Sequence, residues 1–254
     1  DYPGDPMLSF MHWTHRVYPY GPIWLLLTVP LSFLGFRIFL LTFFLFKLLT
    51  AISFVGTVFF IGKILKKISP QYELFGIVFF AFNPLVIVES LVSAHNDIVM
   101  MFFAILSIYL FMNNKYVRSL ILLILSIGIK FASVIIIPIL LVAYFFRKYS
   151  WEKITLLIII GMIIVIVIAS IKTNFQPWYL LYALPFAALT ARKYFILIPS
   201  LVITFFSLLQ YVPFIYLGNW NPPVPTILSY ITNGSILLSL LIIIVWSSRL
   251  LLAR

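Results

Sequence analysis

Long apolar runs, separated by short clusters of basic residues, constrain the fold of this chain more than any other feature. A helix needs about 20 mainly apolar residues to cross a membrane, and an open sheet would leave backbone groups unpaired in lipid. The pattern therefore predicts an all-α fold, a polytopic integral membrane helical bundle with short re-entrant or half-length helices. The apolar runs lie at about 22–35, 38–62, 72–92, 98–112, 119–129, 131–146, 154–171, 178–190, 194–216 and 227–248.

Composition excludes the main soluble classes of protein. Hydrophobic residues make up 64% of the 254 residues and charged residues only 9%, whereas soluble domains carry roughly 25% charged residues. The net charge of +11 resembles that of a nucleic-acid-binding protein, but the basic residues stand between apolar runs, as in cytoplasmic loops. We therefore expect membrane lipid, and no nucleic acid, among the partners. The chain has no cysteine, which excludes thiolate catalysis.

The basic clusters orient the chain, because positive charge favours cytoplasmic loops. The outer side then receives residues 1–21, the loop 93–97, the break near Lys130, and the loops 172–177 and 218–225. Run 22–35 must dip in and return, or lie at the interface, and two half-length helices must meet near Lys130. Broken helices are tolerated where they line a cavity, so this break predicts a site. The basic clusters are Lys63, Lys66 and Lys67; Lys115 and Arg118; Arg147, Lys148 and Lys153; Arg192 and Lys193; and Arg249 and Arg254.

All three histidines and most of the acidic residues gather on this outer side. Glu89 lies in an apolar run, where a carboxylate is costly and usually functional; the alternative is a protonated or serine-bonded glutamate. The string His95-Asn96-Asp97 follows in a short outer loop, after Pro84, which should kink its helix. A carboxylate and an imidazole at a membrane interface suit the binding of a sugar hydroxyl or a metal. The alternative for Asp97 is a cap at a helix start.

Three further groups extend the predicted site, each with a structural alternative. The aromatic residues among them also suit the interfacial belt of a membrane protein. Lys130 is either a phosphate ligand beside a helix start or a lysine that reaches to the surface. The groups are His12, His15, Arg16 and Tyr20 before the first apolar run; Lys130 between half-helices; and Gln176, Trp178 and Tyr179 at the start of another short helix.

The motifs together resemble the polyprenol-phosphate-dependent glycosyltransferases of the GT-C class, most closely the bacterial and archaeal mannosyltransferase-like members. The resemblance extends over most of the chain in the same order. It rests on Tyr18-Pro19-Tyr20-Gly21-Pro22-Ile23-Trp24, Asn83-Pro84-Leu85 with Glu89, His95-Asn96-Asp97, Lys130 and Pro138, and Gln176-Pro177-Trp178-Tyr179 with Pro185.

The resemblance implies a multi-pass enzyme of the plasma membrane with its active site on the outer face. Such enzymes move a sugar from a polyprenyl-phosphate donor to the hydroxyl of a glycan, lipid or protein acceptor. The catalytic carboxylate of the family follows the first transmembrane helix, so Asp1, Asp5 or an aspartate before residue 1 is its counterpart. Asp97 matches the second acidic position. Residues 1–21 are then the remnant of a large outer loop, and 22–254 form a single transmembrane domain.

The chemistry of sugar transfer suggests a role for each of these residues. A carboxylate must take the proton of the acceptor hydroxyl, and Asp97 or the upstream aspartate is the candidate. Arg16, Lys130 or a divalent metal held by His95 and Asp97 would stabilise the leaving phosphate; the identity of any cofactor stays open. Two other functions remain as alternatives: a transporter or flippase of a lipid-linked or small polar substrate, which the mid-span Lys47 favours, and a non-catalytic membrane subunit.

Overall fold

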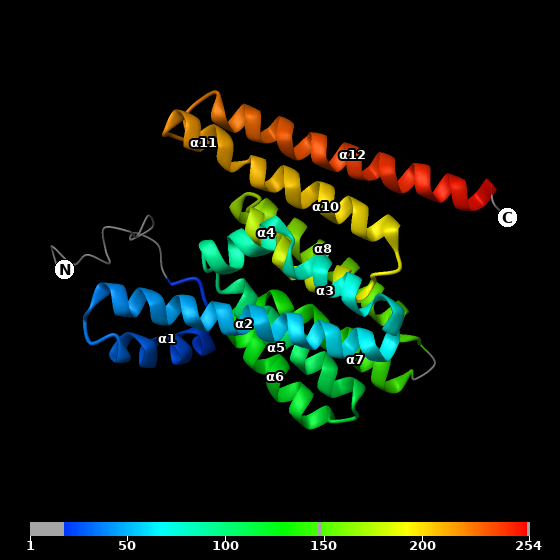
Figure 1. Cartoon of the computed structure of the whole chain (residues 1–254), viewed down its shortest axis with the longest axis horizontal. Coiled ribbons are helices and arrows are strands. Elements are labelled where there is room, and N and C mark those ends of the chain that lie inside the picture. Colours follow the sequence, from blue (N-terminus) through cyan, green and yellow to red (C-terminus); the bar gives the residue numbers. More distant parts are fainter. Residues whose placement is uncertain (1–17, 147–148, 253–254) are drawn as a thin grey trace.

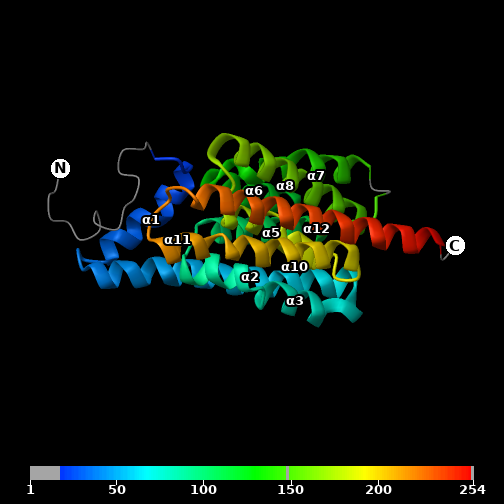
Figure 2. The same cartoon turned by 90° about the horizontal axis from the view of Figure 1, so that it is seen from above.

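A computed structural model describes residues 18–146 and 149–252, and every regular element within them is helical. The helices form an elongated bundle, with α10 and α12 side by side along one flank (Figures 1 and 2). The elements are α1 (Pro22–Leu34), α2 (Phe39–Ile68), η2 (Pro70–Tyr72), α3 (Glu73–Ala81), α4 (Pro84–Ile87), η3 (Val88–Val92), α5 (Asp97–Met112), α6 (Tyr116–Ile129), η4 (Phe131–Ile135), α7 (Ile136–Phe145), α8 (Trp151–Thr173), η5 (Pro177–Tyr182), α9 (Leu184–Leu189), α10 (Tyr194–Leu209), α11 (Tyr211–Leu217) and α12 (Val224–Leu252).

Several of the described helices are long and apolar enough to cross a membrane, which confirms the predicted helical membrane bundle. They are Phe39–Ile68, Trp151–Thr173, Tyr194–Leu217 and Val224–Trp246, and a bent pair of helices between residues 70 and 92 adds one more candidate. The central helix α5 has only 16 residues. It is shielded by protein rather than lipid, because Ile98, Met100, Met101 and Ile105 are fully buried.

Two breaks lie where the sequence predicts them. The first separates α3 from α4 with a bend of 55°. There the Asn83 side chain accepts from Leu85 N at 3.0 Å and caps the helix that Pro84 begins, so the predicted kink at Pro84 is confirmed. At the second break α6 ends before Lys130, whose backbone is extended, and η4 and α7 follow. Two short helical segments thus meet at Lys130, as predicted.

One end of the bundle carries basic residues. Lys67 Nζ donates to Asn113 Oδ1 at 2.5 Å, which joins the end of α2 to the end of α5. Glu152, in the first turn of α8, forms ion pairs with Arg192 and Lys193. From this basic end α5 extends about 24 Å, at 1.5 Å per residue, to Asp97 at its other end. Asp97 and the described basic residues around Lys67 therefore lie at opposite ends of the central helix.

Helix α1 forms over run 22–35, which the sequence expects either to dip in and return or to lie at the interface. Gly21 N–H donates to Ile129 C=O at 3.0 Å, so α1 begins beside the Lys130 break. From there it extends away from the basic end, against the first turns of α2, and Arg37 lies in the turn between them (Figure 1). The run therefore lies along α2 with none of its residues buried, and its placement at the membrane interface stays a prediction. The run can lie along α2 because the 30 residues of α2 span about 45 Å and extend past the site.

The start of α1 gives a test of this arrangement. A Cβ on Gly21 would overlap the backbone carbonyl of Gly128, which cannot rotate away. We expect Gly21→Ala to lower the free energy of unfolding by about 1–3 kcal/mol, the usual cost of overpacking, in thermal denaturation in detergent. Gly234→Ala is the matched control, since nothing lies within 4 Å of its Cβ position. Equal stability of the two variants would contradict the close contact between α1 and α6.

Candidate active site

The loop 93–96 folds back on the helix before it. It follows η3, a single π-helical turn, and Ala94 adopts a left-handed backbone with φ of 57°. His95 N–H donates to Glu89 C=O at 2.9 Å. Single π-turns and left-handed non-glycine residues are common at functional sites. The fold-back brings Glu89 and His95 together beside the start of α5.

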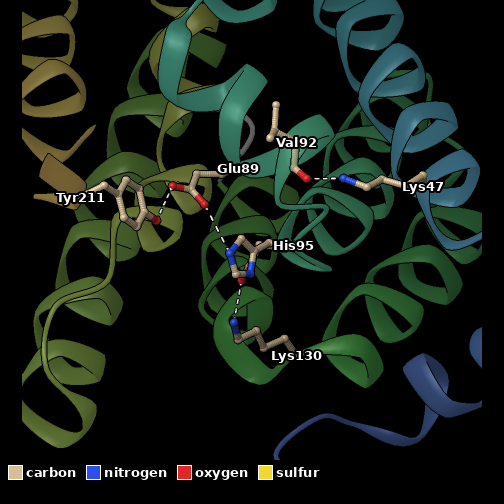
Figure 3. A network of polar contacts seen from close by, with 7 residues as sticks. Lys47, Glu89, Val92, His95, Lys130 and Tyr211 are labelled. Carbon is tan, nitrogen blue, oxygen red and sulfur yellow. Dashed lines mark hydrogen bonds and ion pairs between the residues drawn. The ribbon is translucent and has the colours of Figure 1, made fainter. Parts of the chain in front are cut away.

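Glu89 is fully buried and contacts two side chains. Tyr211, from α11, donates its hydroxyl to Glu89 Oε1 at 2.8 Å. His95 Nε2 lies 3.3 Å from Glu89 Oε2, within range of an ion pair but outside hydrogen-bond geometry, so this oxygen has no hydrogen-bond partner. Figure 3 shows Tyr211 and His95 on two sides of Glu89. The hydrogen-bonding partner of the glutamate is thus a tyrosine from a distant helix rather than a serine.

The His95 imidazole is held by stacking. Its ring centre lies 4.2 Å from that of Trp178, and the two planes are 22° apart. Burial lowers the pKa of His95 below its usual value, and the nearby Lys130 acts in the same direction while Asp97 opposes both. The imidazole is therefore neutral at pH 7, with one nitrogen as a donor and the other as an acceptor.

Asp97 and Lys130 form a buried ion pair. Lys130 Nζ lies 2.7 Å from Asp97 Oδ1, and the Asp97 side chain is 1% exposed against 23% for Lys130. No side-chain hydrogen bond caps the start of α5, so Asp97 is not the helix cap that the alternative interpretation expected. Lys130 likewise directs its ammonium inward to a carboxylate instead of outward to the surface.

Neighbouring groups fix Lys130 in this position. The buried Ser126 hydroxyl contacts Met100 O and Ser133 Oγ, each at 2.8 Å, and so ties the ends of the two half-helices to α5. The ammonium lies 5.6 Å from the ring centres of both Tyr179 and Tyr182. Cation–π contacts of this kind stabilise a desolvated cation. Lys130 is therefore positioned by α5, by the two half-helices on either side of it, and by the tyrosines of η5.

Tyr20 brings the amino-terminal motif to the same place. The hydrogen bond of Gly21 to Ile129 holds the preceding tyrosine beside the Lys130 break. Burial raises the pKa of Tyr20, and Lys130, Asp97 and Tyr179 are all close enough to influence it. The described part of the motif thus borders the Asp97–Lys130 pair.

Four buried polar atoms within residues 89–97 have no hydrogen-bond partner among the described residues. Such atoms are rare in proteins and indicate water, an ion or a ligand. The site therefore has hydrogen-bonding capacity that the described protein atoms leave unused, in a place shielded from lipid. The atoms are Glu89 Oε2, Ser90 Oγ, Asn96 Nδ2 and Asp97 Oδ2.

Not every predicted site residue is part of this cluster. Gln176 precedes η5, and its backbone carbonyl accepts from Tyr179 N at 3.0 Å. Asn96 adjoins Asp97, and its side chain is buried. Five predicted residues lie outside the described part of the chain: Asp1, Asp5, His12, His15 and Arg16.

Two tyrosines of the cluster were not predicted. Tyr182 lies one helical turn after Tyr179, so helical spacing from the predicted motif was a usable signal. Tyr211 follows Gln210, and two polar-headed residues near the outer end of an apolar run were a weaker signal. The contact of Tyr211 with Glu89, 122 positions away, cannot be predicted from the residues next to either one.

The donor set does not form an evident metal centre. Among the described residues, no group of three or more His, Asp or Glu side chains is placed to hold a metal ion. Asp97 Oδ1 is already paired with Lys130. Metal binding by His95 and Asp97 therefore stays a prediction, and no step below depends on it.

Comparison with known proteins identifies the family. No curated protein and no solved structure matches the chain. A family model described as alpha-(1->6)-mannopyranosyltransferase, N-terminal domain, matches residues 9–146, which is more than half of the 254 residues. The match includes Glu89, His95, Asp97 and Lys130, while Trp178 and Tyr211 come from beyond it. The chain therefore belongs to this mannosyltransferase family and is a membrane glycosyltransferase.

Proposed function

We propose that the protein is a GT-C-type enzyme that moves mannose from a polyprenyl-phosphate donor to an acceptor hydroxyl. The family description supports mannose as the sugar and an α-(1→6) linkage in the product. Membrane-spanning helices around the site support a donor that is itself held in lipid. The sequence has no Gly-rich nucleotide-binding loop, which favours a lipid-linked donor over a soluble nucleotide sugar.

The observation that carries this proposal is the state of Asp97. One carboxylate oxygen is paired with Lys130, the other is buried without a hydrogen bond of standard geometry to the described residues, and the Tyr182 hydroxyl lies beside the same carboxyl group. The Lys130 ammonium occupies one side of the carboxyl group, and the second oxygen stays available to accept a proton. A buried carboxylate with a free oxygen is what a general base requires.

The reaction then uses this oxygen. As the acceptor oxygen forms its bond to C1 of mannose, its proton passes to Asp97 Oδ2. The bond between C1 and the phosphate oxygen breaks at the same time, and polyprenyl phosphate leaves with the electron pair. Because acceptor and leaving group lie on opposite faces of C1, the configuration inverts. Proton transfer of this kind contributes about 10²- to 10⁴-fold to a rate.

The surrounding residues have supporting roles in the proposal. The stacked rings of His95 and Trp178 offer a flat, partly exposed surface beside the carboxylate. Sugar rings bind such surfaces through their apolar C–H faces. Lys130 holds the carboxylate in place through the contact of its ammonium with Asp97 Oδ1 and adds positive potential near the leaving phosphate. Arg16, which lies outside the described residues, stays a candidate for direct phosphate binding, as do Asp1 and Asp5 for the catalytic carboxylate.

The proposed orientation places this site at the outer surface of the plasma membrane. It follows from the basic end of the bundle, which belongs in the cytoplasm by the positive-inside rule. Residues 1–21 then belong to an outer loop, and residues 22–254 form one transmembrane domain.

Lys47 no longer favours a transporter. Its ammonium donates to Leu91 O at 3.0 Å and also contacts Val92 O (Figure 3). The last carbonyls of a helix lack intrahelical partners, and a cation near them is favourable. The mid-span charge is thus explained as a helix cap, without a polar path through the bilayer.

A donor assay tests the proposed function. The purified full-length protein in lipid vesicles is offered radiolabelled mannose on polyprenyl phosphate or on a nucleotide, with an α-mannoside acceptor. We expect label in the acceptor only from the lipid-linked donor. Transfer from the nucleotide sugar at an equal rate would contradict the proposal, and so would movement of intact donor across the bilayer without transfer.

A further inference from the structure

A second polar recess lies at the basic end of the bundle, remote from Asp97. It has a volume of about 430 Å³ and lies where the end of α2, the start of α8 and the turn between α9 and α10 meet. Lys67, Arg192 and Lys193 line it, together with Glu152. The mechanism proposed above uses none of these residues.

The recess carries an excess of positive charge. Three basic side chains line it against one carboxylate, and both Arg192 and Lys193 are paired with that carboxylate, Glu152. Among the described residues, Lys67 contacts the neutral groups Asn113 Oδ1 and the ring of Tyr109. The Lys193 side chain, which is paired with Glu152, is only 19% exposed. Arg192 is 48% exposed, so Lys193 is the cation that combines poor hydration with incomplete neutralisation, and such a cation favours an anion.

Neutral groups in the recess suit a phosphate. Ser69 contributes a hydroxyl to its lining. The 23-residue helix α8 begins there, with Ser150 as its N-cap, and the start of a helix adds positive potential. Burial lowers the pKa of Lys193, and the charge of Arg192 acts in the same direction; a bound anion would oppose both effects.

The apolar part of the lining distinguishes a lipid from a free ion. Ile68, Leu189 and Trp151 border the same recess, and tryptophan favours the headgroup region of a bilayer. We propose that this recess binds the phosphate headgroup of an anionic phospholipid from the leaflet at the basic end. The cations contact the phosphate, and the acyl chains lie along the apolar rim.

Lipid binding by the intact protein tests the proposal. The full-length protein is reconstituted in phosphatidylcholine, and the midpoint of thermal unfolding is followed as phosphatidylglycerol replaces it. We expect phosphatidylglycerol to raise the midpoint. Lys67→Gln should weaken the apparent affinity about fivefold, the effect of one cation near a membrane surface, and Lys67→Arg should restore it. Lys115→Gln is the matched control, a basic residue that is not part of the lining.

A second variant with the opposite expected effect on lipid affinity shows whether Lys67→Gln acts on binding or only on folding. Glu152→Gln removes the one acidic side chain of the lining, so it should strengthen phosphatidylglycerol binding while Lys67→Gln weakens it. Inorganic phosphate is titrated in parallel with the protein in phosphatidylcholine. A rise of the midpoint with free phosphate equal to that with phosphatidylglycerol would overturn the lipid assignment. Equal effects of Lys67→Gln and Lys115→Gln would overturn the recess itself.

Discussion

Asp97→Asn is expected to slow mannose transfer by about 10²- to 10⁴-fold, the contribution of a general base. The amide has the same shape as the carboxylate, and its oxygen still accepts from Lys130 at the position of Asp97 Oδ1. The amide NH2 group then occupies the position of the unpartnered Asp97 Oδ2, and it cannot take a proton. The loss should therefore appear in kcat at saturating donor, with little change in KM.

The control for this variant is an acid that is remote from the site. Glu73 lies at the start of α3, and Glu73→Gln should leave the transfer rate unchanged. Circular dichroism and thermal unfolding show that both variants fold. Transfer by Asp97→Asn at the wild-type rate would remove Asp97 from the chemistry and leave the catalytic role to Asp1, Asp5 or an upstream aspartate.

Lys130→Met is expected to destabilise the protein strongly. It leaves the Asp97 carboxylate, which is 1% exposed, without its cation. Breaking a buried ion pair by removing one partner costs about 3–5 kcal/mol, because the remaining charge is uncompensated. Thermal or denaturant unfolding in detergent should show a loss of this size relative to wild type.

A double variant separates stability from catalysis. Asp97→Asn combined with Lys130→Met removes both charges, so most of the lost stability should return while transfer stays as slow as in Asp97→Asn. Lys130→Arg should keep the protein folded, because it preserves the positive charge. A Lys130→Met variant as stable as wild type would mean that Lys130 reaches to the surface and does not hold Asp97.

Several parts of the site were predictable because they depend on local chemistry. Pro84 has no backbone N–H, so a break before Glu89 followed from the sequence. The break at Lys130 followed from the lengths of the apolar runs around it. Charge placement predicted that Asp97, His95 and Lys130 share one side of the membrane, and they meet in one cluster with Trp178.

Pairings across the fold were not predictable. Spacing gave no reason to join Lys130 to Asp97, 33 positions away, or Tyr211 to Glu89. Each contact depends on which helices are neighbours, and hydropathy does not encode this because every face of these helices is apolar. The direction of α1 likewise depends on how far α2 extends past the site.

The sequence by itself determined that lipid surrounds most of this protein, that its fold is helical, where the helices break, and that the basic clusters lie away from Asp97. These properties follow from hydropathy, proline and charge, which act within a single segment. Only the tertiary structure decided that the Asp97 carboxylate is paired through one oxygen and unpartnered through the other. That outcome depends on the depth and angle at which separate helices meet, because two charges interact strongly only when the fold brings them within a few ångströms in a place that excludes water.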